Sequence, residues 1–245
     1  MQTHHARKLT LPDTHNIRDL GGYGVPEGGM TQWRRILRGE SLVHLTDAGR
    51  GQLVADGLCL VIDLRGEGEI AVEPNPFEGQ GDVEYRNIAL FDALAPIGMT
   101  EAPFDMAARY CDALDRCGVR LAQVLRAIAE APEGMVLFHC TAGKDRTGIV
   151  AAMLLLLAGV AEGDVVEDYA LTAIVAAPML KRLREAARLR FADEAHIDLV
   201  LASDAATMRA MLEHLQARHG GIAAYGAAIG LSAAEVGRIV DRLCR

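Results

Sequence analysis

The segment that most constrains the fold is a pair of apolar runs joined by a short polar loop. The first run extends from Met135 to Phe138, and the second, longer one extends from Ile149 to Ala158. A short apolar run before a glycine-containing loop and a long one after it predict a buried strand, a tight turn and a buried helix. The loop holds Cys140 and Arg146 six positions apart, near its two ends.

This arrangement suits the binding of a phosphate against a thiolate. A helix N-terminus presents unpaired N–H groups and the positive end of the helix dipole, which favour anions, including a cysteine thiolate. Gly143 allows the backbone to approach a ligand closely, and the planar fork of Arg146 matches two phosphate oxygens. We therefore expect the phosphate to be bound by Thr141, Ala142, Gly143, Lys144, Asp145 and Arg146.

Two other kinds of site fit the loop poorly. A P-loop of nucleotide-binding proteins requires Ser or Thr after Gly143-Lys144 and a glycine five residues before Gly143, but Asp145 and Phe138 stand there. A zinc site is also disfavoured, because His139 and Cys140 are neighbours that point to opposite faces of a strand, and no Cys-x2-Cys pair is present.

The loop resembles the signature of the protein tyrosine phosphatase superfamily, His-Cys-x5-Arg-Thr. The fuller form, His139 to Gly148, is similar to the bacterial branch that acts on phosphotyrosine and sometimes on phosphoinositides. The likeness runs from about Leu11 to the C-terminus. Four further motifs resemble that branch in order: Asn16-Ile17-Arg18-Asp19-Leu20-Gly21-Gly22, Arg38-Gly39-Glu40-Ser41, Val61-Ile62-Asp63-Leu64-Arg65 followed by Glu67 and Glu69, and Asp168-Tyr169-Ala170-Leu171.

The resemblance implies a cysteine-dependent phosphatase with Cys140 as nucleophile and Arg146 as phosphate ligand, acting through a phosphocysteine intermediate. It implies neither a metal nor a cofactor. Phosphotyrosine on proteins is the expected substrate, with phosphoserine and phosphothreonine as further substrates and phosphoinositides as the alternative. A catalytically silent phosphate-binding module and a rhodanese-type sulfur transferase are the rivals outside the phosphatases.

The general acid is expected within the loop. Many tyrosine phosphatases carry the acid in a Trp-Pro-Asp loop, but here the single tryptophan, Trp33, is followed by Arg34. Asp145 is the candidate, because a protonated carboxyl beside the phosphate can donate to the leaving oxygen. The alternative is Asp92, which follows a predicted strand at the edge where active-site loops leave a parallel sheet.

Other residues are expected to support the loop. His139 is predicted to be a buried histidine that holds the cysteine in place, and the hydroxyl of Thr147 to reach back towards the sulfur. Asp63, with Arg65, is predicted to form an ion pair or a cap beneath the loop. Lys144 is expected to add positive charge at the pocket mouth, which keeps inositol phosphates in consideration.

The rest of the chain predicts an α/β fold, with a central, mostly parallel sheet flanked by helices, in a single domain over 1–245. Within it, Met179 to Gly221 is a candidate helical lid. Strands are predicted at 58–64, 83–88 and 135–139. Helices are predicted at 47–55 after the cap Thr46, at 104–131 with a break at Gly118, at 147–158, at 162–175, and after the capping box at Ser232.

Composition limits the partners and the compartment. A net charge of -8 argues against nucleic acid, and the apolar run after the loop is too short for stable membrane insertion. Five cysteines without paired spacing and no visible signal peptide predict a cytoplasmic protein, with export by another route left open. The expected oligomeric state is a monomer or weak dimer. The basic group Lys181, Arg182, Arg184, Arg188 and Arg190 is read as a solvated helix face or, alternatively, as a lid that attracts anions.

Overall fold

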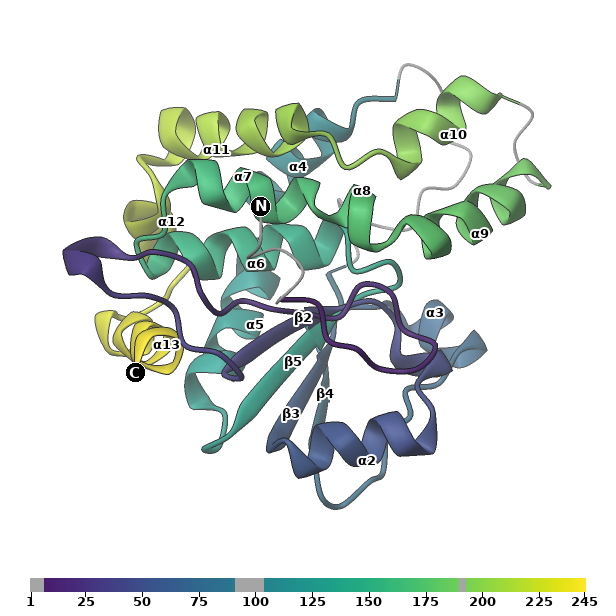
Figure 1. Ribbon diagram of the computed structural model, residues 1–245. Helices are drawn as coiled ribbons and strands as arrows, with labels where there is room; N and C mark the ends of the chain where they lie inside the picture. Colours follow the sequence, from purple (N-terminus) through teal and green to yellow (C-terminus); the bar gives the residue numbers. More distant parts are fainter. Residues whose placement is uncertain (1–6, 91–103, 190–192) are drawn as a thin grey trace.

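A five-stranded sheet lies at the centre of the computed structural model, which describes residues 7–90, 104–189 and 193–245 (Figure 1). The strand order is β1-β2-β5-β3-β4. β2, β5, β3 and β4 run parallel, and β1 pairs antiparallel to β2. The strands are β1 (Arg18–Asp19), β2 (Ile36–Gly39), β3 (Leu58–Asp63), β4 (Glu84–Asn87) and β5 (Met135–His139).

The predicted parallel sheet is therefore confirmed, with β3, β4 and β5 at the predicted places. β1 and β2 were not predicted as strands. β2 has only two apolar residues, Ile36 and Leu37, before Arg38, and such a short pattern does not indicate a buried strand. Arg38 is nevertheless completely buried, because its ion pair with Asp168 compensates its charge.

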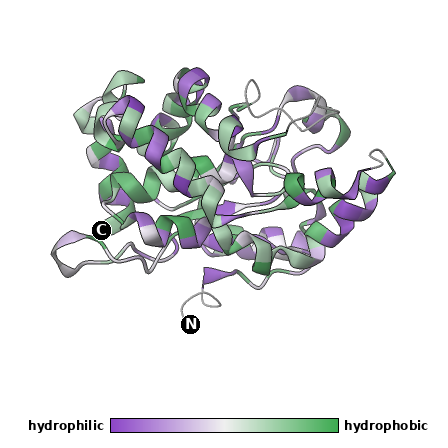
Figure 2. Cartoon of the chain, turned by 90° about the horizontal axis from the view of Figure 1, so that it is seen from above, coloured by the Kyte–Doolittle hydropathy of each residue, from purple (hydrophilic) through white to green (hydrophobic). Residues whose placement is uncertain are grey.

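The strands alternate between two apolar cores. In β5, Val136 and Phe138 face the larger core, whereas Met135 and Leu137 face the smaller one. The larger core is covered by residues of α4 to α7 and α11 to α13, and the smaller one by α2 and neighbouring loops. Figure 2 shows apolar residues gathered towards the middle of the molecule. Burial on both faces explains why β3 and β5 are almost continuously apolar.

The helices follow the predicted boundaries closely. Thr46 caps α2 by accepting from the Gly49 N–H at 3.1 Å, and Ser232 opens α13 with the predicted capping box. The helices are α2 (Asp47–Ala55), α3 (Glu67–Val72), α4 (Met106–Arg116), α5 (Gly118–Glu130), α6 (Asp145–Leu157), α7 (Glu162–Ala170), α8 (Thr172–Val175), α9 (Ala177–Arg188), α10 (Glu194–Leu201), α11 (Ala205–His219), α12 (Ile222–Ala228) and α13 (Ala233–Cys244), with short 3-10 turns η1 (Pro26–Gly28) and η2 (Leu42–His44). Within the described ranges, no helix combines the length and the apolar character needed to cross a membrane.

The candidate lid is divided in two. α9 and α10 pack on each other and extend to one side of the molecule (Figure 1). α11, in contrast, packs on α4 and α7 and buries Met208, Met211 and Leu215 in the larger core. A lid over the site would therefore be formed by α9 and α10 rather than by the whole of 179–221.

Candidate active site

The predicted loop lies at the carboxyl edge of the parallel strands. Gly39 of β2 and Asp63 of β3 both pair in register with His139, so the ends of three strands meet directly before Cys140. α6 begins at Asp145, two residues earlier than predicted, which places Arg146 on its first turn. The strand, the loop and the helix thus bring Cys140 and Arg146 to the two ends of one tight turn, as predicted.

The carbonyl groups of the loop are held away from its centre. Thr141 O accepts from the Ser41 N–H at 2.9 Å, Ala142 O from Asn16 Nδ2 at 2.9 Å, and Gly143 O from Arg38 Nη2 at 2.8 Å. In a trans peptide the N–H of the next residue points opposite to the carbonyl. The N–H groups of residues 142–144 therefore face the inner side of the loop, and no backbone carbonyl of the described chain accepts from them. Successive N–H groups of this kind form an anion-binding nest.

Gly143 is required by both its conformation and its surroundings. Its φ is +66°, in the left-handed region, and a Cβ at this position would lie 2.6 Å from Gly39 O. The loop therefore packs directly on the end of β2, which no residue with a side chain would permit without a shift of backbone.

Arg146 is oriented by Glu69, at the start of α3. Nη1 donates to Oε2 at 2.6 Å and Nη2 to Oε1 at 2.8 Å, and Thr141 Oγ1 donates to the same carboxylate. Burial alone would raise the pKa of Glu69, but the hydrogen bonds and charge of Arg146 outweigh it and lower that pKa. The hydrogen bonds of Arg146 to described residues all use Nη1 or Nη2, which leaves the Nε edge for a ligand. Glu69 was recognised only as part of a motif, and its capping position at the helix start was the available signal.

A buried ion cluster lies beneath the loop. Asp168 pairs with Arg38, whose other Nη donates to Gly143 O, and it accepts from Tyr23 Oη at 2.9 Å. Arg18 donates to Asp168 O at 3.0 Å, and burial, with the charge of Arg38, lowers the pKa of Arg18 to about 10. Burial would raise the pKa of Asp168, yet Arg38 and Arg18 hold it below its usual value. The sequence motifs contain Arg18, Arg38 and Asp168 without showing that they meet, and Tyr23 lies outside them.

His139 lies buried beside the backbone of Cys140. It is completely buried, its Nδ1 lies 3.0 Å from Cys140 O, and its Nε2 lies 2.8 Å from Asn75 Nδ2. Burial lowers the pKa of His139, so the neutral ring donates from Nδ1 and accepts at Nε2. The imidazole therefore holds the cysteine backbone.

Asp63 supports the loop through Arg65. Its carboxylate accepts from Arg65 Nη2 at 2.7 Å and from Asn75 Nδ2 at 3.0 Å, and Arg65 Nη1 reaches Ser41 Oγ at 3.1 Å. Burial would raise the pKa of Asp63, but the charge of His139 once its ring is protonated at low pH, the hydrogen bonds and charge of Arg65, and the hydrogen bond from Asn75 lower it to about 2. The predicted ion pair beneath the loop is present, and it extends to the serine whose N–H holds Thr141.

Asp145 lies on the first turn of α6 with its carboxylate 27% exposed. Its Oδ1 accepts from Tyr110 Oη at 2.7 Å and lies 3.3 Å from Lys144 Nζ. Burial raises the pKa of Tyr110 well above its ordinary value, so the phenol remains a donor. The carboxylate is thus held in a defined position beside the loop. Asp92, the alternative acid, lies outside the described residues.

Two loop side chains differ from expectation. Lys144 is only 2% exposed, and its Nζ donates to Val200 O at 2.5 Å and Ala202 O at 2.9 Å at the end of α10. Its ammonium is therefore bound to the C-terminal end of a helix rather than placed as a cation at the pocket mouth. The hydroxyl of Thr147 donates to Gly39 O at 3.5 Å instead of to the sulfur.

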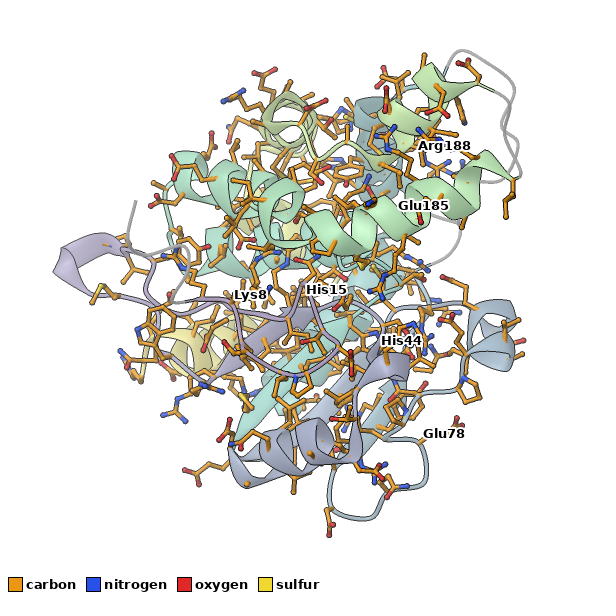
Figure 3. All side chains as sticks on the ribbon, turned by 45° about the vertical axis from the view of Figure 1, so that its right-hand side comes forward. Lys8, His15, His44, Glu78, Glu185 and Arg188 are labelled. Carbon is orange, nitrogen blue, oxygen red and sulfur yellow. The ribbon has the colours of Figure 1, made fainter. Side chains whose placement is uncertain are left out.

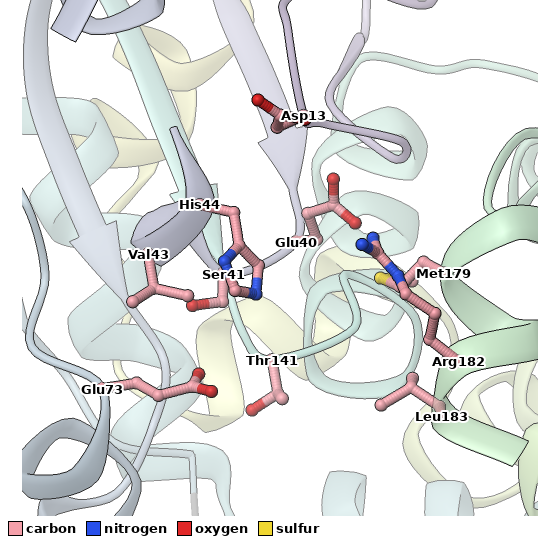
Figure 4. A pocket seen from close by; sticks show the side chains of 10 residues that line it. All are labelled: Asp13, Glu40, Ser41, Val43, His44, Glu73, Thr141, Met179, Arg182 and Leu183. Atoms are coloured by element: carbon pink, nitrogen blue, oxygen red, sulfur yellow. The ribbon is translucent and has the colours of Figure 1, made fainter. Parts of the chain in front are cut away.

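A cavity of about 350 Å³ adjoins the loop at Thr141. Figure 4 shows its walls, with His44 on one side, Arg182 of α9 on the other and Glu40 between them. The acidic side chains that line it are Asp13, Glu40 and Glu73, against one arginine. The cavity therefore extends the loop towards α9 with a predominantly acidic lining.

The basic group on α9 is divided between two tasks. Arg184 pairs with Asp198, and Arg188 with Glu194 at 2.6 Å, so both fasten α9 to α10. Figure 3 shows Arg188 on the outer part of α9. Arg182 instead lines the cavity beside Thr141, and Arg190 lies outside the described residues.

Comparison with known proteins gives a consistent result. The model of the tyrosine phosphatase family matches residues 9–245. A tyrosine-protein phosphatase from Nostoc commune is 40% identical over 142 residues, which cover 56% of this chain and 48% of the relative. A candidate tyrosine-protein phosphatase from Cupriavidus necator is 33% identical over 169 residues, which cover 66% of this chain and 61% of the relative. The triple specificity protein phosphatase PtpB from Mycobacterium tuberculosis is 27% identical over 270 residues, which cover 94% of this chain and 96% of the relative.

The match thus spans about half of the first relative and almost all of the third. Since the family match extends over nearly the whole chain, from the first support of the loop to the last helix, the chain belongs to the tyrosine phosphatase family.

Proposed function

We propose that the protein is a cysteine-dependent phosphatase that hydrolyses phosphotyrosine on proteins. The observation that carries this proposal is the loop itself. Its carbonyls accept hydrogen bonds from Ser41, Asn16 and Arg38, so the N–H groups of residues 142–144 face a point on the inner side of the loop. Cys140 and Arg146 stand at the two ends of this loop. A phosphoryl group at that point would meet a nucleophile, a ring of donors and a bidentate cation.

In the first step, the Cys140 thiolate attacks phosphorus in line with the ester oxygen. A phosphorus–sulfur bond forms while the phosphorus–oxygen bond breaks, and Asp145 gives its proton to the departing tyrosine oxygen. The loop N–H groups and Arg146 stabilise the equatorial oxygens. Glu69 acts through Arg146 by fixing the plane of the guanidinium.

In the second step, a water molecule attacks the phosphocysteine. The Asp145 carboxylate accepts a proton from this water, the phosphorus–sulfur bond breaks, and inorganic phosphate leaves with the Cys140 thiolate restored. Tyr110, which donates to Asp145 at 2.7 Å, holds the carboxylate in place through both steps.

The cavity beside Thr141 supports a protein substrate over a phosphoinositide. Its acidic residues Asp13, Glu40 and Glu73 would repel the additional phosphates of an inositol ring. Lys144, the cation that would have favoured such a ring, is bound to the end of α10. A peptide with neutral or basic residues beside the phosphotyrosine suits this lining better. Phosphoserine and phosphothreonine remain proposed secondary substrates, since the mycobacterial relative is named a protein phosphatase of more than one specificity.

The nucleophile assignment is tested with Cys140→Ser. We expect turnover of p-nitrophenyl phosphate, measured with EDTA present, to fall by at least ~1,000-fold, because a serine hydroxyl is a far weaker nucleophile than a thiolate. Binding of a phosphotyrosine peptide, measured by calorimetry, should persist. Cys244→Ser, at a partly buried cysteine of α13, is the matched control and should retain wild-type turnover. Wild-type turnover in Cys140→Ser would refute the assignment, and a wild-type protein that binds without turnover would instead be a silent phosphate-binding module.

The acid is tested by comparing Asp145→Asn with Asp92→Asn. Loss of the acid should lower kcat ~100-fold and remove one limb of the pH–rate profile. We expect this effect from Asp145→Asn alone. If Asp92→Asn instead lowers kcat and loses that limb, while Asp145→Asn keeps a normal pH–rate profile, the general acid is Asp92.

Substrate class is tested with phosphotyrosine peptides and phosphoinositide vesicles. The wild type should show the higher kcat/KM on peptides, and Glu73→Lys should narrow the difference by removing an acidic charge from the cavity. Arg182→Glu should lower kcat/KM on phosphoinositide vesicles more than on phosphotyrosine peptides, because it removes the arginine of the cavity. A higher kcat/KM of the wild type on vesicles would favour the phosphoinositide alternative.

A further inference from the structure

A cluster of metal-ligating side chains lies where the ends of α4 and α11 meet. Asp115 is near the end of α4, and His214 and His219 are on the last turns of α11. Nε2 of His214 and Nε2 of His219 lie 3.0 Å and 2.8 Å from the same oxygen, Asp115 Oδ1. Over the described residues, this is the one group of three or more His, Cys, Asp or Glu whose ligand atoms all lie within 4.8 Å of one another.

We propose that Asp115, His214 and His219 form a binding site for Zn²⁺ or a similar borderline divalent cation, which fastens α4 to α11. Two imidazole nitrogens and one carboxylate oxygen are a ligand set that zinc prefers. A solvent molecule would supply the fourth ligand, since the three side chains are 19% to 27% exposed.

Two of the three separations between ligand atoms are close to those of this coordination, and the ligand nitrogens of the two histidines lie within 4.8 Å of each other. With zinc–ligand bonds of about 2.0–2.1 Å, two ligands of a tetrahedral ion lie roughly 3.3 Å apart. The distances of 2.8 Å and 3.0 Å in the cluster need to lengthen by only a few tenths of an ångström. Each imidazole would then bind zinc through Nε2 and carry its proton on Nδ1, so the two Nε2 atoms face the metal in place of the hydrogen bonds to Asp115.

The surrounding structure holds the ligands in place and favours a cation. Tyr225 Oη donates to Leu114 O at 2.6 Å, directly before Asp115, and the ring of Tyr225 packs edge-on against His219 at 4.8 Å between centroids. The C-terminal ends of α4 and α11 both face this point, and each carries partial negative charge from its last carbonyl groups.

One nearby cation opposes binding. Arg218 Nε lies 3.3 Å from Asp115 Oδ1. Its side chain is 65% exposed, so it can turn into solvent when a metal takes the carboxylate. A competing arginine lowers the affinity without blocking the site, and Arg218→Gln should therefore strengthen binding.

The test uses ZnCl₂ and the full chain without an affinity tag, in a Cys140→Ser background that removes the active-site thiol as a competing ligand. Calorimetry should show one high-affinity equivalent, and saturating Zn²⁺ should raise Tm by roughly 5 °C. His214→Gln with His219→Gln should remove both effects. Asp115→Asn should weaken binding at least ~10-fold, and Co²⁺ should give the visible absorption of a tetrahedral site only when both histidines are present.

The matched control is His4→Gln with His5→Gln, which removes the adjacent histidine pair near the N-terminus and should leave binding unchanged. The proposal is overturned if the wild-type ligand set binds no Zn²⁺ at micromolar concentration. It is equally overturned if the His214/His219 double variant, shown to be folded by circular dichroism, binds Zn²⁺ as before.

Discussion

The scaffold beneath the phosphate loop and the α9–α10 pair use the same chemistry, Arg–carboxylate pairs, in opposite surroundings. Beneath the loop, Arg38 and Asp168 are 0% and 2% exposed. Between α9 and α10, Arg184 and Asp198 are 33% and 61% exposed. A buried pair becomes very costly when one partner is lost, whereas an exposed pair contributes little. The first therefore fixes the loop through the bond of Arg38 to Gly143 O, whereas the second joins α9 to α10 with only a small contribution to stability.

The largest expected effect is on the buried side of this comparison. Asp168→Asn should lower the free energy of unfolding by about 3–5 kcal/mol, because Arg18 and Arg38 would remain buried without a countercharge. Urea denaturation measures the change. A loss below 1 kcal/mol would show that the cluster is less important than its burial suggests.

The next effect concerns the geometry that the scaffold maintains. Gly143→Ala should lower kcat/KM ~100-fold, because the added Cβ meets Gly39 at 2.6 Å and displaces the loop. Gly79→Ala is the matched control, since Gly79 also has a positive φ (+74°) but no atom within 4 Å of the added Cβ. Equal activity losses in the two variants would indicate a general effect of positive φ rather than a displaced loop.

The pH dependence of stability tests the buried scaffold further, through Asp63. The pKa of Asp63 is about 2 in the folded protein against an ordinary value of 3.8, so its carboxylate stabilises the fold above pH 4 and loses this effect as the pH falls towards 2. The full contribution is about 2 kcal/mol. The difference in unfolding free energy between the wild type and Asp63→Asn should therefore narrow by about 1 kcal/mol from pH 6 to pH 3. A constant difference would contradict the lowered pKa.

The smallest effect is expected in α10. Asp198→Asn removes the partner of Arg184 and should cost no more than about 1 kcal/mol, a cost that salt reduces further. Urea denaturation at low and high ionic strength measures it. A loss as large as that of Asp168→Asn would remove the contrast between the two regions.

Much of the fold follows from local patterns. The run from Met135 to Ala158 indicated a buried strand, a turn and a buried helix, and the caps Thr46 and Ser232 marked the starts of two helices. β2 was not predicted, because its apolar pattern is only two residues long and Arg38 is buried with a partner, Asp168, that is distant in the sequence. Periodicity reports which residues face a core, but it does not report which charges meet there.

The candidate site divides along the same line. The sequence by itself determined that Cys140, Gly143, Asp145 and Arg146 share one turn between a strand and a helix, because neighbours in the chain are necessarily neighbours in space. Only the tertiary structure decided how Arg146 is oriented, by a glutamate 77 positions away, and how Gly143 O is held, by an arginine 105 positions away. The tertiary structure also places the Lys144 ammonium at the end of α10 rather than at the predicted pocket mouth. These contacts depend on how separate elements pack, and no local pattern encodes that.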